Sequence, residues 1–291
     1  MSHDREFINL IEPEVVRDAY RLELAAGAQC LVTQTAGITR ARLAHTNRED
    51  QAAELAQAAL CVVNSLRPQH VFAEIGPCGL PLDSSNEASL EQSRAQYAQA
   101  AEAFGEGGFD AFFLNGMTHP ADMRCALEGV RAVTQMPIIA SLDLPFQADA
   151  VEVRDQSILG EEEGLFWPGG SGFRDAFMMM EACGAAVVGF ASTAPLELVC
   201  AYAKRLRAMV SVPLLVQLSI GPANPKQMAA TAENPYFCPD VLIEAATELR
   251  GAKVQFLRAC GNARPAYTGA LAIASSGFDV LTRKEAGADG H

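Results

Sequence analysis

The sequence predicts an α/β fold, a single (β/α)8 barrel of the TIM type whose first strand is truncated or atypical. Short apolar segments alternate with amphipathic helical segments along the 291 residues, as in a parallel sheet with crossover helices. The apolar segments also lack the polar alternation of a half-exposed strand, which is typical of strands buried on both faces. The unit recurs roughly seven times at about 35-residue spacing, so we expect residues 1–291 to form one barrel domain rather than two.

Seven segments carry the strand signal because they are rich in β-branched and other apolar residues. They are residues 28–35, 70–76, 110–116, 137–144, 185–190, 213–219 and 252–259. Strands of such a barrel run in the same direction, so polar residues at their carboxyl ends meet at one mouth. We expect the functional site at this mouth.

Amphipathic helices are predicted between the strands. The first covers residues 13–28, with Pro13 at its first position and Gly27 at its end, which favour a helix start and a helix stop. The others cover residues 47–66, 89–108, 121–134, 195–209 and 239–251. Pro265 is placed to open one more helix after the last strand.

Two long loops interrupt the repeat. Residues 145–172 follow a strand and carry the only tryptophan, so this loop is a candidate lid on the catalytic face. It is equally well interpreted as a solvated insertion with one aromatic anchor. Residues 220–236 form a second long loop on the same face.

Charge limits the partners. The net charge of −13 and the pI of about 4.8 disfavour binding to phosphate backbones and anionic lipids. No apolar run is long enough to span a bilayer, and the N-terminus lacks the apolar stretch of a signal peptide. We therefore expect a cytoplasmic protein that binds a small-molecule substrate, without nucleic-acid or membrane partners.

The eight cysteines give no metal signal by spacing alone. None forms a CxxC pair, and they are spread through the chain. In a reducing cytosol most of them are expected to be free buried thiols.

Six stretches, taken in order, resemble one known family. They read "FINLIEPEVVRDAYRLELAAGAQCLVTQTAGITRARLA", "EIGPCGLPL", "FFLNGMTHPADMRCALEGV", "GAAVVGFAS", "VQLSIGPANP" and "RACGNARPAYTGALA". In this order they resemble the homocysteine S-methyltransferase family, which includes the homocysteine-binding barrel of cobalamin-dependent methionine synthase. The resemblance runs over roughly residues 6–276 and implies the same barrel fold.

The resemblance also implies a chemistry. In this family three cysteines hold zinc at the carboxyl-terminal mouth, and zinc binds homocysteine sulfur as a thiolate that attacks a methyl group. In methionine synthase the methyl group comes from a cobalamin on a partner domain, and in relatives it comes from betaine or a sulfonium. The implied function is a methyltransferase of methionine biosynthesis, with a cobalamin, a folate (pterin) or a similar methyl donor and a corrinoid protein as a partner. The acceptor is a thiol or another soft nucleophile.

The zinc positions differ from the family pattern. Ser192 and Ala259 match two of the three cysteines, and only Cys260 remains as a family zinc ligand. A hydroxyl and a single thiolate do not make a tight zinc site, so zinc is expected to bind weakly or to be absent.

The charges at the mouth differ as well. Asn115 matches a family glutamate that faces the substrate ammonium, and Arg258 adds a fixed positive charge beside Cys260. We therefore expect the mouth to prefer an anionic ligand, or one without an ammonium, over homocysteine.

Three interpretations of Cys260 stay open. It is a buried relic thiol, a thiolate whose pKa Arg258 lowers, or a ligand of a rebuilt metal site that includes Cys78 and His119. The second catalytic candidate is Asp143, a base or positioning residue, although a carboxylate at a strand end is as often a helix cap. The predicted substrate-binding residues are Gln34, Thr35, Cys78, Asn115, Ser192, Gln217 and Arg258, with Ser219 lining the pocket beside Gln217.

The family's first strand has no counterpart in this chain. Seven strands would leave two unpaired edges, and we expect closure by the N-terminal residues, through the "EFINL" segment of residues 6–10, or by contacts in a homo-oligomer. Two functions therefore compete: a methyltransferase with a degraded zinc site, and a non-catalytic barrel that binds a small molecule or a corrinoid partner.

Overall fold

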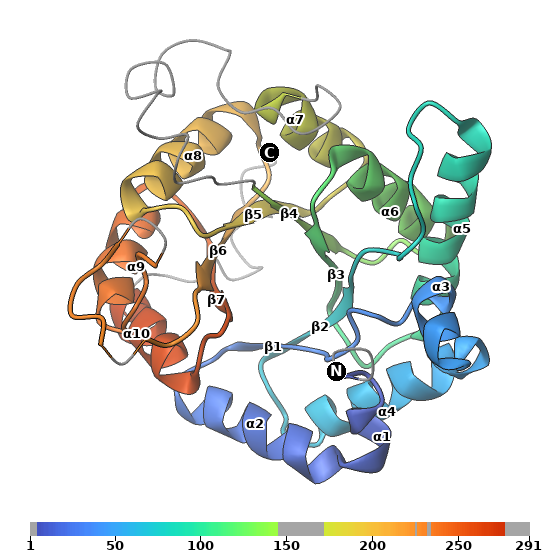
Figure 1. Ribbon diagram of the computed structural model, residues 1–291, viewed down its shortest axis with the longest axis horizontal. Helices are drawn as coiled ribbons and strands as arrows, with labels where there is room; N and C mark the ends of the chain where they lie inside the picture. Colours follow the sequence, from blue (N-terminus) through green and yellow to red (C-terminus); the bar gives the residue numbers. More distant parts are fainter. Residues whose placement is uncertain (1–4, 145–171, 225, 232–233, 277–291) are drawn as a thin grey trace, which may run out of the picture.

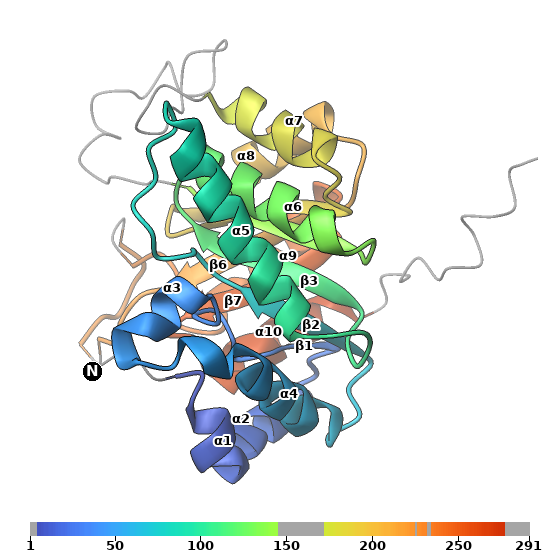
Figure 2. The same ribbon diagram turned by 90° about the vertical axis from the view of Figure 1, so that its right-hand side faces the viewer.

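The computed structural model describes residues 5–144, 172–224, 226–231 and 234–276. A curved parallel sheet lies at the centre, and helices form the outer layer (Figure 1). The side view shows α4 and α5 in front of the strands (Figure 2). This arrangement confirms the predicted barrel-type α/β fold. No helix in the described part of the chain is long and apolar enough to cross a bilayer.

All seven predicted strands are present, and they pair in chain order from β1 to β7. They are β1 (Cys30–Val32), β2 (His70–Ile75), β3 (Ala111–Met117), β4 (Ile138–Asp143), β5 (Val187–Ser192), β6 (Leu214–Ile220) and β7 (Phe256–Gly261). Every pairing is parallel. Their carboxyl ends therefore lie at one end of the sheet.

The predicted helices are present within a few residues of their expected ends. They are α2 (Pro13–Ala25), α4 (Ala52–Asn64), α5 (Glu87–Ala103), α6 (Pro120–Val133), α8 (Leu196–Met209), α9 (Val241–Gly251) and α10 (Pro265–Ser275). Three short helical segments accompany α4: α3 (Arg40–Leu43) and two 3₁₀ turns, Ala44–Thr46 and Glu49–Gln51.

One helix, α7 (Phe173–Ala182), was not predicted. Its buried residues Phe173, Ala176, Phe177 and Met180 recur at helical spacing, which is the signal of an amphipathic helix. The candidate lid, residues 145–172, precedes α7. It lies outside the described residues except for Gly172. The second long loop is described in most of its length, and Tyr236 anchors it by donating from its hydroxyl to the carbonyl of Ala194 at 2.8 Å.

The prediction that "EFINL" forms the missing strand is wrong. The segment turns into a short helix, α1 (Ile8–Ile11). The buried side chain of Asn9 donates to the carbonyls of Glu6 and Gln34. Glu6 in turn accepts from the backbone N–H of Gly37 at 2.6 Å. These contacts hold the segment as a helical turn. A strand would instead need backbone hydrogen bonds to a neighbouring strand.

Helices α2 and α10 lie together across the gap between β1 and β7. Thr268 of α10 donates to the Glu23 carboxylate of α2 at 2.6 Å. Gly27 follows the end of α2 and has φ +104°. A Cβ at this position would come 2.7 Å from the Cβ of Ala272, so only glycine fits this contact. Tyr20 ties α2 to the sheet by donating to the carbonyl of Val32 at 2.7 Å.

Apolar side chains fill the lower part of the barrel. They form one cluster: Ala111, Phe113, Ile139, Val187 and Leu215, packed against Val32, Phe72 and Phe256. The larger core cluster lies between the sheet and the helices. Alternation along each strand therefore identifies which side chains point into the barrel.

Candidate active site

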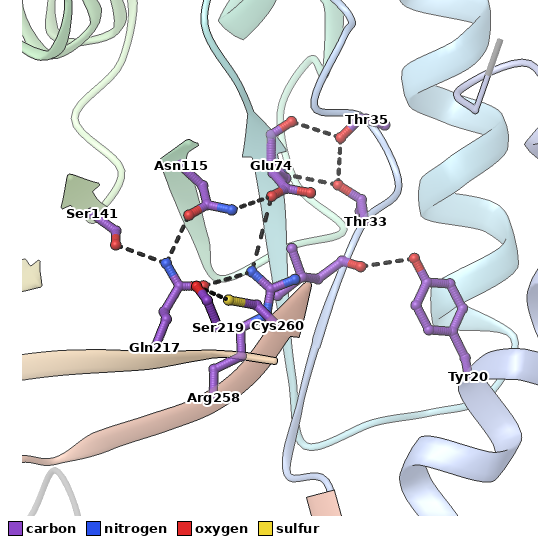
Figure 3. Close-up of polar contacts among 11 residues, drawn as sticks. Tyr20, Thr33, Thr35, Glu74, Asn115, Ser141, Gln217, Ser219, Arg258 and Cys260 are labelled. Atoms are coloured by element: carbon purple, nitrogen blue, oxygen red, sulfur yellow. Dashed lines mark hydrogen bonds and ion pairs between the residues drawn. The ribbon is translucent and has the colours of Figure 1, made fainter. Parts of the chain in front are cut away.

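A ring of polar side chains lies one inward position further along the strands than the apolar cluster. Figure 3 shows this ring. Arg258 Nη1 donates to Gln217 Oε1 at 3.0 Å, and Gln217 Nε2 donates to Asn115 Oδ1 at 2.7 Å. Asn115 Nδ2 then donates to Glu74 Oε1 at 2.6 Å. Glu74 Oε1 lies 4.0 Å from Arg258 Nη1, which closes the ring. Four strands, β7, β6, β3 and β2, are thus linked across the barrel.

The direction of the ring follows from its chemistry. Arg258 can only donate, so Gln217 must turn its amide oxygen toward the guanidinium and its N–H groups away. The same Gln217 Nε2 also donates to Ser141 Oγ at 2.7 Å. Asn115 then has its oxygen committed to Gln217 and its nitrogen to Glu74. The structure therefore brings three predicted residues, Asn115, Gln217 and Arg258, into one site.

Sequence reasoning missed Glu74. Its carboxylate is only 12% exposed, and burial raises its pKa, while Arg258 and the Asn115 hydrogen bond act in the opposite direction. The signal was a lone glutamate at an inward position of the apolar segment "HVFAEIG". Because Glu74 supplies a carboxylate beside Asn115, the mouth is not simply positive, and the charge difference inferred from Asn115 alone was incomplete.

Two threonines that follow β1 form hydrogen bonds with the backbone of Glu74. Thr33 Oγ1 accepts from the Glu74 N–H at 2.9 Å, and Thr35 Oγ1 donates to the Glu74 carbonyl at 2.7 Å. Thr35 is fully buried, so it positions Glu74 rather than offering its hydroxyl to a ligand. Gln34 points elsewhere and donates to the carbonyl of Arg5 at 2.9 Å.

Asp143 ends β4 on the inward side. Its Cα is paired with Ala191, which pairs with Gln217, which pairs with Arg258, so all four lie at one level of the sheet. Burial raises the pKa of Asp143 to about 6. Within the described part of the chain no hydrogen bond reaches this carboxylate, so a helix-capping role has no support there.

Cys260 lies on β7 one inward position above Arg258 (Figure 3). Its sulfur is 3.2 Å from the hydroxyl oxygen of Ser219. Burial raises the pKa of the Cys260 thiol, although Ser219 and Arg258 act to lower it. The thiol is therefore protonated at neutral pH, which favours a buried thiol over a thiolate.

The remaining predicted residues lie away from the ring. Ser192 falls on the face of β5 that carries Val188 and Phe190, which pack in the core between sheet and helices, and its hydroxyl accepts from the Ala194 N–H at 3.1 Å. Cys78 is 2% exposed in the same core cluster, and its backbone N–H donates to the Tyr97 hydroxyl.

The model of the family described as Homocysteine S-methyltransferase matches residues 3–272. The chain belongs to the homocysteine S-methyltransferase family. Methionine synthase of Mycobacterium tuberculosis is 24% identical over 254 residues, which cover 82% of this chain but 20% of that protein.

Solved structures show the same fold as this family member. The metallated form of the homocysteine methyltransferase MmuM from Escherichia coli has a TM-score of 0.68 and 18% identity, covering 91% of this chain and 86% of that one. A methyltransferase from Methanosarcina mazei has a TM-score of 0.54 and 11% identity, covering 90% and 84%.

The side chains at the family's zinc positions do not fit zinc. Ser192 uses its hydroxyl as a strand-end cap, Ala259 has no donor, and Cys260 contacts Ser219. The rebuilt alternative is not assembled either, since His119 caps α6 through Nδ1 and Cys78 is buried in the helix-side core. Among the described residues no three histidine, cysteine, aspartate or glutamate side chains are grouped to hold a metal.

We expect the purified protein to lack stoichiometric zinc, because one protonated thiol and a hydroxyl are poor ligands. Elemental analysis of the protein and of Cys260→Ala measures this. About one zinc per chain in the wild type, lost in the variant, would show that Cys260 belongs to a metal site after all.

Proposed function

We propose that this family member is a methyltransferase that methylates a small thiol or another soft acceptor at the barrel mouth, with Asp143 rather than zinc removing the acceptor proton. One observation carries the proposal: a partly buried carboxylate whose pKa is about 6 lies at the inward carboxyl end of β4. A general base works best with a pKa near the working pH.

The chemistry balances without a metal. The acceptor X–H gives its proton to the Asp143 carboxylate while its lone pair forms the new bond to the methyl carbon. The bond between that carbon and the donor breaks, and its electron pair stays with the donor. A methylated corrinoid, on a partner protein or free, and a methylated pterin are the donors that the family membership favours.

The polar ring supports this reaction by holding the floor of the site rigid. Each amide in the ring has one orientation, so the lining does not need to reorganise when the acceptor binds. The apolar cluster beneath it closes the barrel from below, which confines the acceptor to the mouth.

Methyl transfer is tested directly by incubating the purified chain with methylcobalamin or 5-methyltetrahydrofolate and a small thiol, and detecting the methyl thioether by mass spectrometry. We expect product from at least one donor, and none without protein. Thiol binding without transfer from any donor would refute the proposal and identify a non-catalytic binding barrel.

A further inference from the structure

Helix α2 carries apolar side chains on its outer face as well as on its inner face. On the inner face Val16 is buried and Tyr20 donates its hydroxyl to β1, so this side packs on the sheet. Val15, Ala19 and Leu22 lie on the other side at helical spacing, and all three are exposed. We call these three residues the outer stripe. A surface helix normally carries polar residues on such a face.

The outer stripe belongs to the largest gathering of exposed apolar side chains on one part of the described chain. Val15 and Leu22 are 58% and 59% exposed, and Ile11 of the preceding α1 is 58% exposed. The other exposed large hydrophobic side chains of the described residues are divided among α6, α7, α9, α10 and the loop after β6. Apolar surface gathered at one place indicates a contact with another protein surface.

Two opposite charges flank the outer stripe on one side. Asp18 and Arg21 are exposed and pair with each other at 2.6 Å. A second α2, antiparallel and related by a two-fold axis near Ala19, brings Val15 of one copy against Leu22 of the other. Within one helical turn, it also brings Asp18 of one copy against Arg21 of the other. The small side chain of Ala19 at the axis allows the two helices to approach closely.

A parallel pair of the same helices fits less well. It would place Asp18 against Asp18 and Arg21 against Arg21, and like charges in contact repel. The spacing of the apolar and charged residues along α2 is therefore complementary to itself in the antiparallel orientation.

We propose that this chain forms a two-fold dimer in which the outer stripe of α2 packs antiparallel against the outer stripe of a second copy. A second copy is the occupant that fits, because one two-fold axis satisfies both the apolar and the charged pairings. Figure 1 shows α2 on the outside of the barrel. The contact covers a helix that lies across the gap between β1 and β7, and it leaves the barrel mouth free, so the proposed methyl transfer does not require it.

The surface is small, so the dimer is weak. Helix α2 has 13 residues and is about 20 Å long, and two such faces bury less than the roughly 1,600 Å² of a standard interface. We expect a Kd on the order of 10 µM. Sedimentation velocity of the wild type between about 1 and 300 µM is expected to show a shift from monomer to dimer.

Charge reversal tests the pairing between copies. Asp18→Arg places two positive charges on each copy at the contact, and Arg21→Asp places two negative charges there. Each variant alone is expected to associate about 10-fold more weakly or worse. An equimolar mixture of the two variants restores opposite charges across the axis and is expected to form a mixed dimer with about the wild-type Kd. This rescue arises between chains, since each variant lacks the Asp18–Arg21 pair within its own helix.

Glu91→Arg is the matched charge control, because Glu91 is exposed on α5 and the net charge changes by the same amount as in Asp18→Arg. Leu22→Ser is expected to weaken association, whereas Ile243→Ser on α9 is expected to leave it unchanged. Circular dichroism checks that each variant is folded. A wild type that stays monomeric over the whole range, charge variants that associate like the wild type, or a mixture that stays monomeric would overturn the inference.

Discussion

We expect Asp143→Asn to lower kcat/KM for methyl transfer about 100- to 1000-fold, the effect of removing a general base. The amide keeps the size and polarity of the carboxylate but cannot accept the proton. No described residue hydrogen-bonds Asp143, so the substitution breaks no contact in that part of the chain and the loss reports chemistry rather than folding.

The pH profile separates a base from a merely structural carboxylate. Asp143 works in its ionised form, and its pKa is about 6, so wild-type kcat/KM is expected to rise with pH through about 6 and then level off. Cys260 on β7 interacts electrostatically with Asp143, and it is protonated over this range because burial raises the pKa of its thiol. The acid limb at about 6 should disappear in Asp143→Asn.

Asp18→Asn serves as the control, because Asp18 is exposed on α2 and pairs with Arg21 on the same helix. It should retain wild-type kcat/KM and the acid limb. An Asp143→Asn enzyme within a few-fold of the wild type, or one that keeps the limb at about 6, would exclude Asp143 as the base.

The fold could be predicted because each strand and helix carries its own periodic signal. The mostly apolar runs of β2 to β6 identify strands covered on both faces, and Pro13 and Pro265 mark helix starts. The N-terminal segment misled because "EFINL" is short and apolar, and nothing in its sequence shows that Asn9 and Glu6 bind the loop after β1.

The site was harder to predict from the sequence than the fold. Neighbouring residues of a strand point to opposite faces of the sheet, so a shift of one residue moves a side chain out of the barrel. Asn115, Gln217, Arg258 and Asp143 were predicted to line the mouth, and the structure places each of them at an inward position within or at the end of its strand. Ser192 ends β5 on the opposite face and serves as a cap. Glu74 was missed because its role depends on Arg258, a partner 184 positions later in the chain, and such pairing is set by the closed fold rather than by local pattern.

That pairing leads to the largest expected effect on stability. Arg258→Met leaves the Glu74 carboxylate at 12% exposure, with Asn115 as its one side-chain hydrogen-bond donor among the described residues. We expect a loss of about 3 kcal/mol in the free energy of unfolding, since removing one partner of a buried ion pair leaves a charge without compensation. Urea unfolding followed by circular dichroism measures this change.

Glu74→Gln should lower the free energy of unfolding by less than Arg258→Met. In Glu74→Gln the remaining charge is Arg258, which is one-third exposed and reaches water, so we expect a loss of about 1–2 kcal/mol. The double variant Glu74→Gln/Arg258→Met removes both charges and should be more stable than Arg258→Met alone, a coupling that only interacting residues show. Additive losses in the double variant would mean that Glu74 and Arg258 are not paired, and the closed ring would lose its energetic basis.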